Sequence, residues 1–368
     1  MATPLTIQRH VLLTLCVVLF SVTTIATTRD PNIPIGPVFI FGDSTVDVGT
    51  NNYIKNCTAK VNHPYYGIDY PQSKATGRFS NGLNSADTIV ALLGGYEQSP
   101  PPFLALLRDS SNFTGKLLDG VNFASGGAAL VKGLGKDFLG DVISLEEQIQ
   151  QFATVRGNIT ALLGESKGQL LLQGSMYIFS IGSNDIMNYI FSHPTTPEIF
   201  IANITAIYGI HLKNLYNLGA RKFGLISVPS LGCCPIARLF SPGGTCAKET
   251  NDLASAFFTP FESLLKNLSS TLEGFKYSLG NSYNMTMNII NNPKGFKDVA
   301  KACCGNNTIQ GISDCKEGGF LCPHRDDHLF WDAFHPSEAA SKLAARALVF
   351  SEDPDFVTPI NFSTLRSA

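Results

Sequence analysis

Short apolar runs alternate with longer amphipathic stretches along most of this chain. Four of the runs are almost continuous in apolar residues, and they span 37–41, 121–124, 176–180 and 222–228. Continuous apolar runs of this length are typical of strands that are buried on both faces of a parallel sheet. We therefore predict that these four segments are strands of one mostly parallel sheet.

Helix signals fall between the strand-like runs. A helix is predicted to begin at Ser144, because a serine followed three residues later by a glutamate forms a capping box. A long helix is predicted after Thr196, where a proline suits the first helical position and apolar residues recur at steps of three and four. Two more helices are predicted at 86–93 and at about 251–272, with a kink at Pro260. This alternation of strands and helices predicts the α/β class, as a three-layer α/β/α sandwich with a central sheet.

The composition is that of a folded and nearly neutral protein. Of 368 residues, 44% are hydrophobic and only 15% are charged, so the chain can bury a large core and does not resemble a disordered one. The formal net charge is -2 and no basic stretch stands out, which argues against a nucleic-acid partner. Because no repeat or linker divides the body of the chain, residues 27–368 are predicted to form a single domain.

Residues 1–26 have the pattern of a secretory signal peptide. Arg9 and His10 precede an apolar run at 11–20, and small residues follow the run as far as Ala26. The run is short and is followed by Ser and Thr, which favours a cleaved signal over an uncleaved membrane anchor. We therefore predict a secreted, extracellular protein with no stable membrane anchor.

Eight cysteines lie beyond the predicted signal, and an even number in an exported chain suggests disulfides. Their clustering favours local bridges within 233–246 and within 303–322. A reactive thiol at the adjacent Cys233 and Cys234 is a weaker alternative. A zinc site is another weak alternative, since no CxxC pair is present. Its possible ligands are Cys315, Cys322, His324 and His328.

Export is also supported by eight Asn-X-Ser/Thr sequons, which make their asparagines candidates for N-glycosylation. The eight are Asn56, Asn112, Asn158, Asn203, Asn267, Asn284, Asn306 and Asn361.

Polar and glycine residues follow three of the predicted strands. Ser44 comes after the first strand, Gly126 and Gly127 come after the second, and Asn184 comes after the third. Ligands of open parallel sheets bind at the carboxyl ends of the strands, where the strand-to-helix turns gather. His335 lies in a loop close to the C-terminus, in front of another helix-like segment. We expect these residues to meet at one site.

Together these residues make up the components of acyl transfer. A serine hydroxyl such as that of Ser44 is a weak nucleophile until a base accepts its proton, and His335 is the candidate base. Asp332, three residues earlier, can orient the imidazole and balance its charge. The oxyanion needs fixed donors, for which the candidates are the N–H of Ser44, the N–H of Gly127 and the amide of Asn184. Whether Gly127 or its neighbour Gly126 supplies the N–H is left open.

As a set, these stretches resemble the plant-type GDSL esterase/lipases of the SGNH hydrolase superfamily, over about residues 36–350. The resemblance implies an SGNH-hydrolase, flavodoxin-like sandwich, with Ser44 as nucleophile, His335 as base and Asp332 as its orienting partner. It also implies Gly127 and Asn184 as oxyanion donors. The name motif reads Gly-Asp-Ser-Thr here, and its fourth residue has no chemical role. The matching stretches are 41–52, 77–82, 121–128, 180–185 and 332–336.

The resemblance implies a secreted serine ester hydrolase that forms an acyl-enzyme on Ser44 and acts on lipid, cutin-like or acetylated esters. In a plant, its place would be the cell wall or apoplast. No metal or organic cofactor is implied, and the expected partner is a small or polymer-borne ester. Two alternatives stay open, namely an acyltransferase that uses the same site and a non-catalytic glycoprotein that binds wall polysaccharide or lipid. The acyl and alcohol specificity, the sequon occupancy and the oligomeric state are also open.

Other residues are also candidates for a functional role. A Gly-X-Ser-X-Gly motif at 164–168 matches the nucleophile elbow of α/β-hydrolases, but it follows an amphipathic stretch instead of a strand, so we expect Ser166 to lie in a solvated linker. The pairs Tyr65–Tyr66 and Arg78–Phe79 lie in the long loop after Ser44, where they can line an acyl pocket or pack the loop. Pocket lining is slightly favoured.

Overall fold

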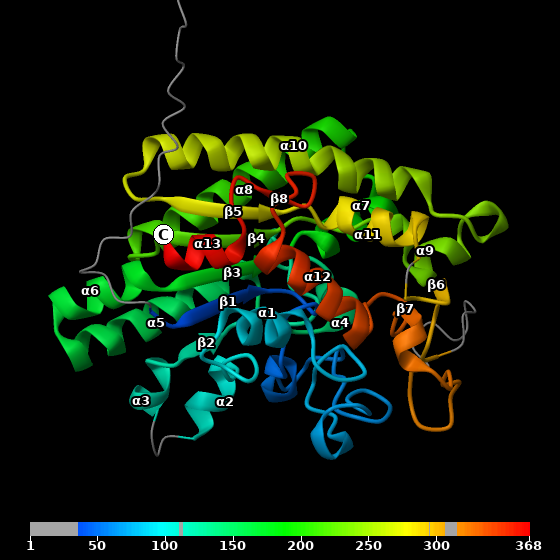
Figure 1. The fold of residues 1–368 in the computed structure, drawn as a ribbon, viewed down its shortest axis with the longest axis horizontal. Coiled ribbons are helices and arrows are strands. Elements are labelled where there is room, and N and C mark those ends of the chain that lie inside the picture. The colour runs from blue at the N-terminus through cyan, green and yellow to red at the C-terminus, as the bar shows by residue number, and fades with distance from the viewer. Residues whose placement is uncertain (1–35, 110–112, 294, 306–314) are drawn as a thin grey trace, which may run out of the picture.

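A six-stranded sheet forms the centre of the molecule in the computed structural model, which describes residues 36–109, 113–293, 295–305 and 315–368 (Figure 1). The strand order is β2-β1-β3-β4-β5-β8, and every pairing is parallel except that of β8. The strands are β1 (Val38–Gly42), β2 (Gly120–Asn122), β3 (Met176–Ser180), β4 (Lys222–Ile226), β5 (Lys276–Gly280) and β8 (Val357–Thr358). All four predicted strands are present, and the predicted α/β class is confirmed.

The central strands are apolar on both faces because helices cover both faces. In β1, Phe39 and Phe41 pack on one side of the sheet, while Val38 and Ile40 pack on the other, and all four are completely buried. Helices on the phenylalanine side are α5 (Leu145–Leu163), α6 (Glu165–Gly174), α7 (Ser183–Ser192), α8 (Pro197–Asn217) and α10 (Lys248–Thr271). Those on the other side are α1 (Ser85–Leu93), α12 (Glu338–Phe350) and α13 (Phe362–Ser367).

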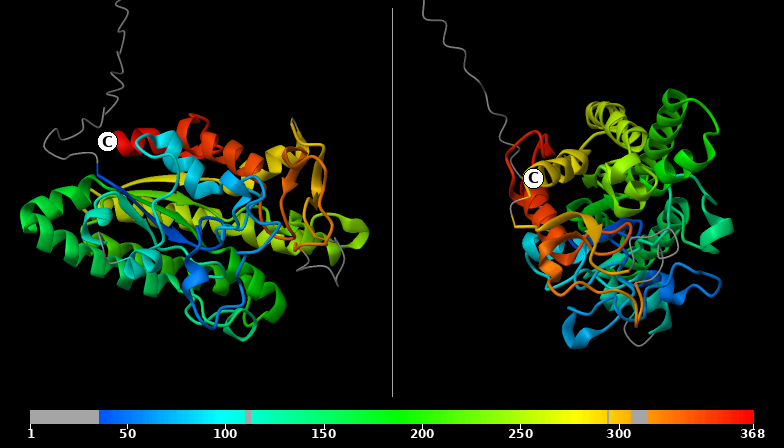
Figure 2. Two further views of the ribbon diagram at one scale, coloured as in Figure 1. Left: turned by 90° about the horizontal axis from the view of Figure 1, so that it is seen from below. Right: turned by 90° about the vertical axis from the view of Figure 1, so that its right-hand side faces the viewer.

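The three layers are visible edge-on in the left panel of Figure 2, where the red and orange C-terminal helices lie on one side of the sheet and green helices lie on the other. The predicted three-layer sandwich is therefore confirmed. The shorter helices are α2 (Phe103–Arg108), α3 (Phe113–Leu117), α4 (Lys136–Leu139), α9 (Pro235–Leu239) and α11 (Ser282–Asn291). A separate pair of strands, β6 (Asp298–Ala302) and β7 (His328–Phe330), lies near the carboxyl end of the main sheet.

The predicted helices are present, although α10 begins at Lys248, three residues before its predicted start. Ser144 accepts a hydrogen bond from the backbone N–H of Glu147, and the glutamate accepts one in return, which makes the capping box of α5. Thr196 caps α8. Pro260 lies inside α10, which continues on both sides of it as one helix. Within the described residues, none of the helices is long and apolar enough to cross a membrane.

Three disulfides join cysteines that are close in sequence, as predicted. They are Cys233–Cys246, Cys303–Cys322 and Cys304–Cys315. The alternative of a zinc site is wrong as it was conceived, because both of its cysteine ligands are bound in disulfides. The predicted signal peptide at 1–26 and the sequons at Asn112 and Asn306 lie outside the described residues.

Candidate active site

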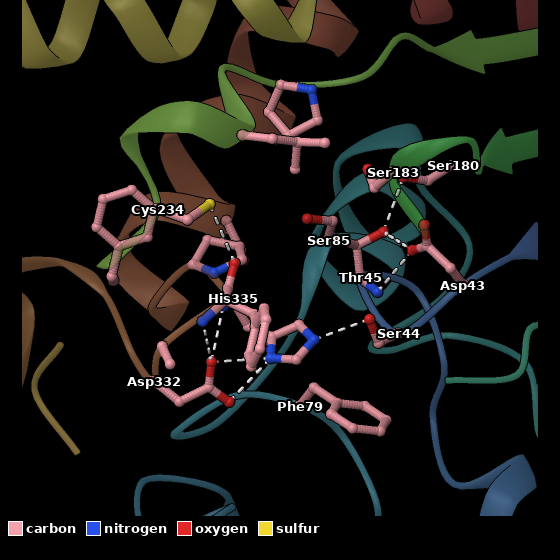
Figure 3. A pocket seen from close by; sticks show the side chains of 18 of the residues that line it. Asp43, Ser44, Thr45, Phe79, Ser85, Ser180, Ser183, Cys234, Asp332 and His335 are labelled. Atoms are coloured by element: carbon pink, nitrogen blue, oxygen red, sulfur yellow. Dashed lines mark hydrogen bonds and ion pairs between the residues drawn. The ribbon is translucent and has the colours of Figure 1, made fainter. Parts of the chain in front are cut away.

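The residues singled out at the strand ends line one cavity at the carboxyl edge of the sheet. The cavity has a volume of about 530 Å³, and Ser44, Gly127, Asn184, Asp332 and His335 all contribute to its wall. Ser44 lies two residues after the end of β1, and Asn184 lies in the first turn of α7, the helix that follows β3. The other end of the chain reaches the same place because the loop between β7 and α12 carries Asp332 and His335 (Figure 3).

Ser44, His335 and Asp332 form a connected chain of side chains. Ser44 Oγ lies 2.8 Å from Nε2 of His335, although the two residues are 291 positions apart in the sequence. On the opposite side of the ring, Nδ1 lies 2.9 Å from Oδ1 and 2.8 Å from Oδ2 of Asp332. An imidazole held in this way has one nitrogen directed at a hydroxyl and the other at a carboxylate, which is the arrangement required for base-assisted attack by serine.

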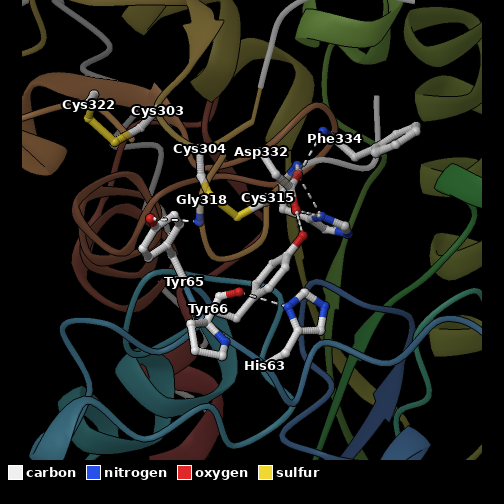
Figure 4. The surroundings of a disulfide bond; sticks show 12 residues. His63, Tyr65, Tyr66, Cys303, Cys304, Cys315, Gly318, Cys322, Asp332 and Phe334 are labelled. Atoms are coloured by element: carbon white, nitrogen blue, oxygen red, sulfur yellow. Dashed lines mark hydrogen bonds and ion pairs between the residues drawn. A yellow bond between two sulfur atoms is a disulfide. The ribbon is translucent and has the colours of Figure 1, made fainter. Parts of the chain in front are cut away.

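The carboxylate of Asp332 is buried but well supplied with donors. The backbone N–H groups of Phe334 and His335 donate to Oδ1 at 2.8 and 2.7 Å, and the Tyr66 hydroxyl donates to Oδ2 at 2.7 Å. Burial alone raises the pKa of Asp332, but the positive charge of His335 and these hydrogen bonds outweigh it and hold the pKa below its usual value. Asp332 therefore stays ionised beside the imidazole. Figure 4 shows Tyr66 reaching this aspartate from the loop beside the Cys304–Cys315 disulfide.

The two adjacent glycines after β2 differ in what their N–H groups do. Gly126 donates its N–H to Oδ2 of Asp47 at 2.8 Å, and its carbonyl accepts a hydrogen bond from Asn51. For Gly127, the described residues offer no hydrogen-bond partner to the N–H, and the residue lines the cavity. A side chain at Gly127 would be strained, since φ is +85° and a Cβ atom would lie 2.5 Å from Leu139.

Two further donors face the same cavity. The backbone N–H of Ser44 has no hydrogen-bond partner within the described part of the chain. The side-chain amide of Asn184 donates one hydrogen bond to the carbonyl of Ala128 at 2.8 Å, which fixes its orientation and leaves its second N–H available. Three N–H donors from three separate strand ends thus lie around one cavity that also contains a serine hydroxyl.

The family model for GDSL-like lipase/acylhydrolase matches residues 38–348 of this chain. The chain is 34% identical over 340 residues to GDSL esterase/lipase At4g16230 of Arabidopsis thaliana, covering 89% of this chain and 90% of that protein. It is 36% identical to GDSL esterase/lipase At2g23540 and 32% identical to GDSL esterase/lipase LTL1, both of the same plant. These alignments cover 90% and 94% of this chain and 88% and 95% of the respective relatives.

The chain belongs to the GDSL-like lipase/acylhydrolase family. The predicted family is thereby confirmed, and so is the predicted enzyme class, a carboxylic ester hydrolase.

Thr45 stands at the fourth position of the motif that gives the GDSL family its name. Its hydroxyl lies 2.7 Å from Oδ1 of Asp43, to which it donates, and 2.7 Å from the hydroxyl of Ser180 at the end of β3. Asp43 is buried, and burial raises its pKa, while the two hydrogen bonds from Thr45 counteract the rise. The threonine therefore ties the turn that carries Ser44 to the neighbouring strand, a structural contact that sequence reasoning did not assign.

Gln148 is a second residue that sequence reasoning missed. Its side chain lies on the buried face of α5 and hydrogen-bonds both the N–H and the carbonyl of Gly42, at 2.9 and 2.8 Å. Gly42 has a φ of +151°, and a Cβ atom there would lie 2.2 Å from the carbonyl oxygen of Ser180. This glycine lets the chain turn sharply into Ser44, and Gln148 fixes the turn. A polar residue on an otherwise apolar helix face is the signal that could have identified it.

In each of the two pairs of candidate pocket residues, one side chain lines the cavity and the other does not. Tyr66 and Phe79 line the cavity, and the Phe79 ring lies 4.8 Å from the ring of His335, measured between centroids. Tyr65 instead accepts a hydrogen bond from the N–H of Gly318. Arg78 forms a buried, two-contact ion pair with Asp87 of α1. The prediction of pocket lining was therefore right for one member of each pair.

The alternative nucleophile lies far from this cavity. Ser166 is exposed in the first turn of α6, which follows the helix α5, not a strand. The segment is helical where a linker was expected. Figure 1 shows α6 at the opposite end of the molecule from α9 and β7. The strand-to-helix turn that a nucleophile elbow requires is missing at this position.

The adjacent cysteines also have separate roles. Cys233 is bound to Cys246, while Cys234 is a buried thiol in the cavity wall whose Sγ lies 3.6 Å from the carbonyl oxygen of Phe334 (Figure 3). Burial raises the pKa of Cys234 to about 12. Because the thiolate is the reactive form of cysteine, this environment makes Cys234 unreactive at neutral pH.

Proposed function

We propose that this protein is a secreted serine carboxylic ester hydrolase whose acyl-enzyme forms on Ser44. The observation that carries the proposal is the 2.8 Å contact between Ser44 Oγ and Nε2 of His335, on a ring whose other nitrogen faces Asp332. A serine hydroxyl becomes a useful nucleophile when a base within hydrogen-bond reach accepts its proton. Membership of the GDSL family supports an ester as the substrate.

In the first half of the reaction, Ser44 Oγ attacks the carbonyl carbon of the ester and its proton passes to Nε2 of His335. Asp332 holds the ring in the tautomer that leaves Nε2 free and stabilises the imidazolium. The bond from the carbonyl carbon to the alcohol oxygen then breaks, and His335 gives its proton to the departing alcohol. The acyl group remains bonded to Ser44.

In the second half, a water molecule attacks the acyl carbon and gives a proton to His335. The bond to Ser44 Oγ breaks, the proton returns to Ser44, and the carboxylic acid leaves. The negative charge that develops on the carbonyl oxygen in both halves is stabilised by the N–H groups of Ser44 and Gly127 and by the amide of Asn184. Gly127 is favoured over Gly126 for this role because the N–H of Gly126 already binds Asp47.

The proposal also includes the export of this protein from the cell. Residues 1–26 direct the chain out of the cell, and residues 27–368 act as one hydrolase domain. Three disulfides support an oxidising destination. Among the sequons in the described residues, Asn56, Asn203 and Asn267 are exposed, which makes them the stronger candidates for glycans. Asn158, Asn284 and Asn361 are partly buried. A mass shift after enzymatic deglycosylation of the exported protein tests this part.

The catalytic proposal is tested with purified protein and two p-nitrophenyl esters, the acetate and the butyrate. Wild-type protein is expected to hydrolyse both, and a serine-directed phosphonate is expected to label the peptide that contains Ser44. Ser44→Ala should abolish both signals without changing the circular dichroism spectrum. Ser166→Ala is the matched control and should behave as wild type. Loss of activity in Ser166→Ala, with Ser44→Ala still active, would overturn the assignment.

The same assay distinguishes the alternatives. Labelling with little hydrolysis until an alcohol is added would identify an acyltransferase, because the acyl-enzyme then needs an alcohol as acceptor. Neither labelling nor hydrolysis by correctly folded protein would identify a binding protein.

A further inference from the structure

The cavity that contains Ser44 extends well beyond the three residues of the proposed catalytic chain. It continues between α11 and α12, over the carboxyl end of β4, where its wall is mostly apolar. The lining residues in this part are Ile226 at the end of β4 and the next residue Ser227, Met285, Thr286 and Ile289 of α11, and Ala340, Ser341, Ala344 and Leu348 of α12. We call this part of the cavity the inner arm.

Small residues on α12 create the space of the inner arm. Ala340, Ala344 and Leu348 are spaced four residues apart, so they lie on one face of the helix, and all three line the cavity. Leu348 packs against β5 at Gly280, where a Cβ atom would lie 2.0 Å from its side chain. A larger residue than alanine at 340 or 344 would occupy volume that is now open.

The inner arm has a buried floor, whereas Thr286, Ile289 and Ala344 in its wall are half-buried. Ile226, Met285 and Leu348 belong to the buried core cluster on the α1–α12 side of the sheet, and none is more than 8% exposed. Elsewhere in the cavity wall, outside the inner arm, Oδ2 of Asp43 and Oγ of Ser230 are buried without a hydrogen-bond partner among the described residues. Unpartnered polar atoms are expected where a wall faces a ligand or water instead of packed protein.

The opposite part of the cavity is open to solvent. Its wall includes Thr58, which is exposed, together with the half-buried Lys60 and His63. In the proposed reaction the alcohol must leave before water attacks, whereas the acyl group stays bonded to Ser44. A mostly apolar arm with a buried floor suits the group that stays, and a more exposed, polar side suits the group that departs.

We infer that the inner arm binds an unbranched acyl chain of medium or greater length, and that Ala344 of α12 is a specificity-determining residue for its length. This inference rests on the proposed function. The whole cavity, of which the inner arm is a part, has a volume of about 530 Å³, which lies within the roughly 300–1,000 Å³ of pockets that bind drug-sized ligands. An acetyl group would leave most of that space without a ligand. Burial of each additional methylene of the acyl chain can raise kcat/KM by roughly fourfold at most.

The test compares kcat/KM for p-nitrophenyl acetate, butyrate, octanoate and laurate. We expect the wild-type value for octanoate to exceed that for acetate by roughly tenfold or more. Ala344→Phe should lower the octanoate value by roughly tenfold or more, while the acetate value stays within about threefold of wild type. Leu343→Phe is the matched control, because Leu343 is 43% exposed on the same helix and does not line the cavity. It should leave the preference unchanged.

If Ala344→Phe does not fold, Ile289→Ala provides the opposite test, since it enlarges the inner arm from α11 and should move the preference from octanoate towards laurate. Wild-type protein that prefers acetate, or a folded Ala344→Phe that loses all substrates equally, would overturn the inference. Both results are compatible with an active Ser44. Failure of the proposed function is recognised separately, as activity that survives in Ser44→Ala.

Discussion

The Tyr66 hydroxyl donates a 2.7 Å hydrogen bond to Oδ2 of Asp332, and the two residues are 266 positions apart in the sequence. Tyr66 belongs to a small buried cluster with Phe79, Trp331 and the cysteines of two disulfides, including the Cys304–Cys315 bridge. The loop after Ser44 is therefore held against the loop that carries the proposed base. Tyr66 acts as a positioning residue, because it touches Asp332 and not the reacting atoms.

Tyr66→Phe removes only the hydroxyl, so it tests this role directly. We expect kcat/KM to fall roughly tenfold, since a hydrogen bond to a charged group contributes about 1.5–3 kcal/mol. The hydrogen bond from Tyr66 is also one of the causes that hold the pKa of Asp332 below its usual value, so its loss should raise that pKa. The acidic limb of the pH–rate profile should therefore move to higher pH.

Tyr65→Phe is the control for that experiment, because the Tyr65 hydroxyl accepts a hydrogen bond from Gly318 and does not contact Asp332. Its pH–rate profile should match that of wild type. A Tyr66→Phe enzyme that is slower by the same factor at every pH would show that the tyrosine only packs the loop.

The parts of the fold that the sequence predicted are those with a local signature. The runs that became β1 to β4 are apolar because both faces of each strand are covered. By contrast, β5 contains Lys276 and Ser278, which interrupt the apolar run, so the strand was missed. The buried hydroxyl of Ser278 is satisfied by the distant carbonyl of Ile360, a contact that no local pattern reveals. The edge strand β8 has only two residues, too few to form a pattern.

The same distinction applies to the site. Ser44, Gly127, Asn184 and His335 each follow a predicted strand or precede a predicted helix, so the sequence placed them at the sheet edge and the structure brings them together. The residues that hold them in place have no such marker. Gln148, for example, acts on a glycine 106 positions away. Contacts of this kind depend on how the layers pack and could not be read from neighbouring residues.

Asn184→Ala tests the proposed oxyanion donors. The hydrogen bond from this amide should strengthen only as negative charge develops on the substrate oxygen, so we expect kcat to fall by roughly 10²–10³ while KM changes little. Asn188→Ala, one turn further along α7 and outside the cavity, is the control and should retain full activity. A raised KM with unchanged kcat would instead assign Asn184 to substrate binding.

Gln148→Leu tests the support of the turn before Ser44. The leucine cannot accept the hydrogen bond from Gly42, whose buried N–H would then lack a partner. We expect the free energy of unfolding to fall by about 1–3 kcal/mol and the activity to fall with it. Gln150→Leu makes the same change at an exposed position of α5 and should leave both quantities nearly unchanged. Equal effects of the two substitutions would refute a specific role for Gln148.

Protonation of the buried Asp185 should make the free energy of unfolding depend on pH. Its carboxylate oxygens accept the N–H groups of Leu130 and Val131 at 2.9 and 3.0 Å. Burial raises the pKa of Asp185 to about 7, although these two hydrogen bonds counteract the rise. In the unfolded chain the carboxyl has a pKa of 3.8. The folded state therefore holds the proton more tightly, and this contribution to stability is full below about pH 4 and is lost as the pH rises towards about 7.

Asp185→Asn cannot titrate, so the variant should lack this pH dependence. We expect the free energy of unfolding of wild type, taken relative to that of the variant, to decrease between about pH 4 and pH 7 and then to level off. Urea unfolding of both proteins at several pH values, with the disulfides intact, measures this difference. Because the direction is set by a raised pKa, a wild-type advantage that stays constant over this range would mean that the hydrogen bonds from Leu130 and Val131 outweigh burial and that the folded carboxyl is ionised throughout.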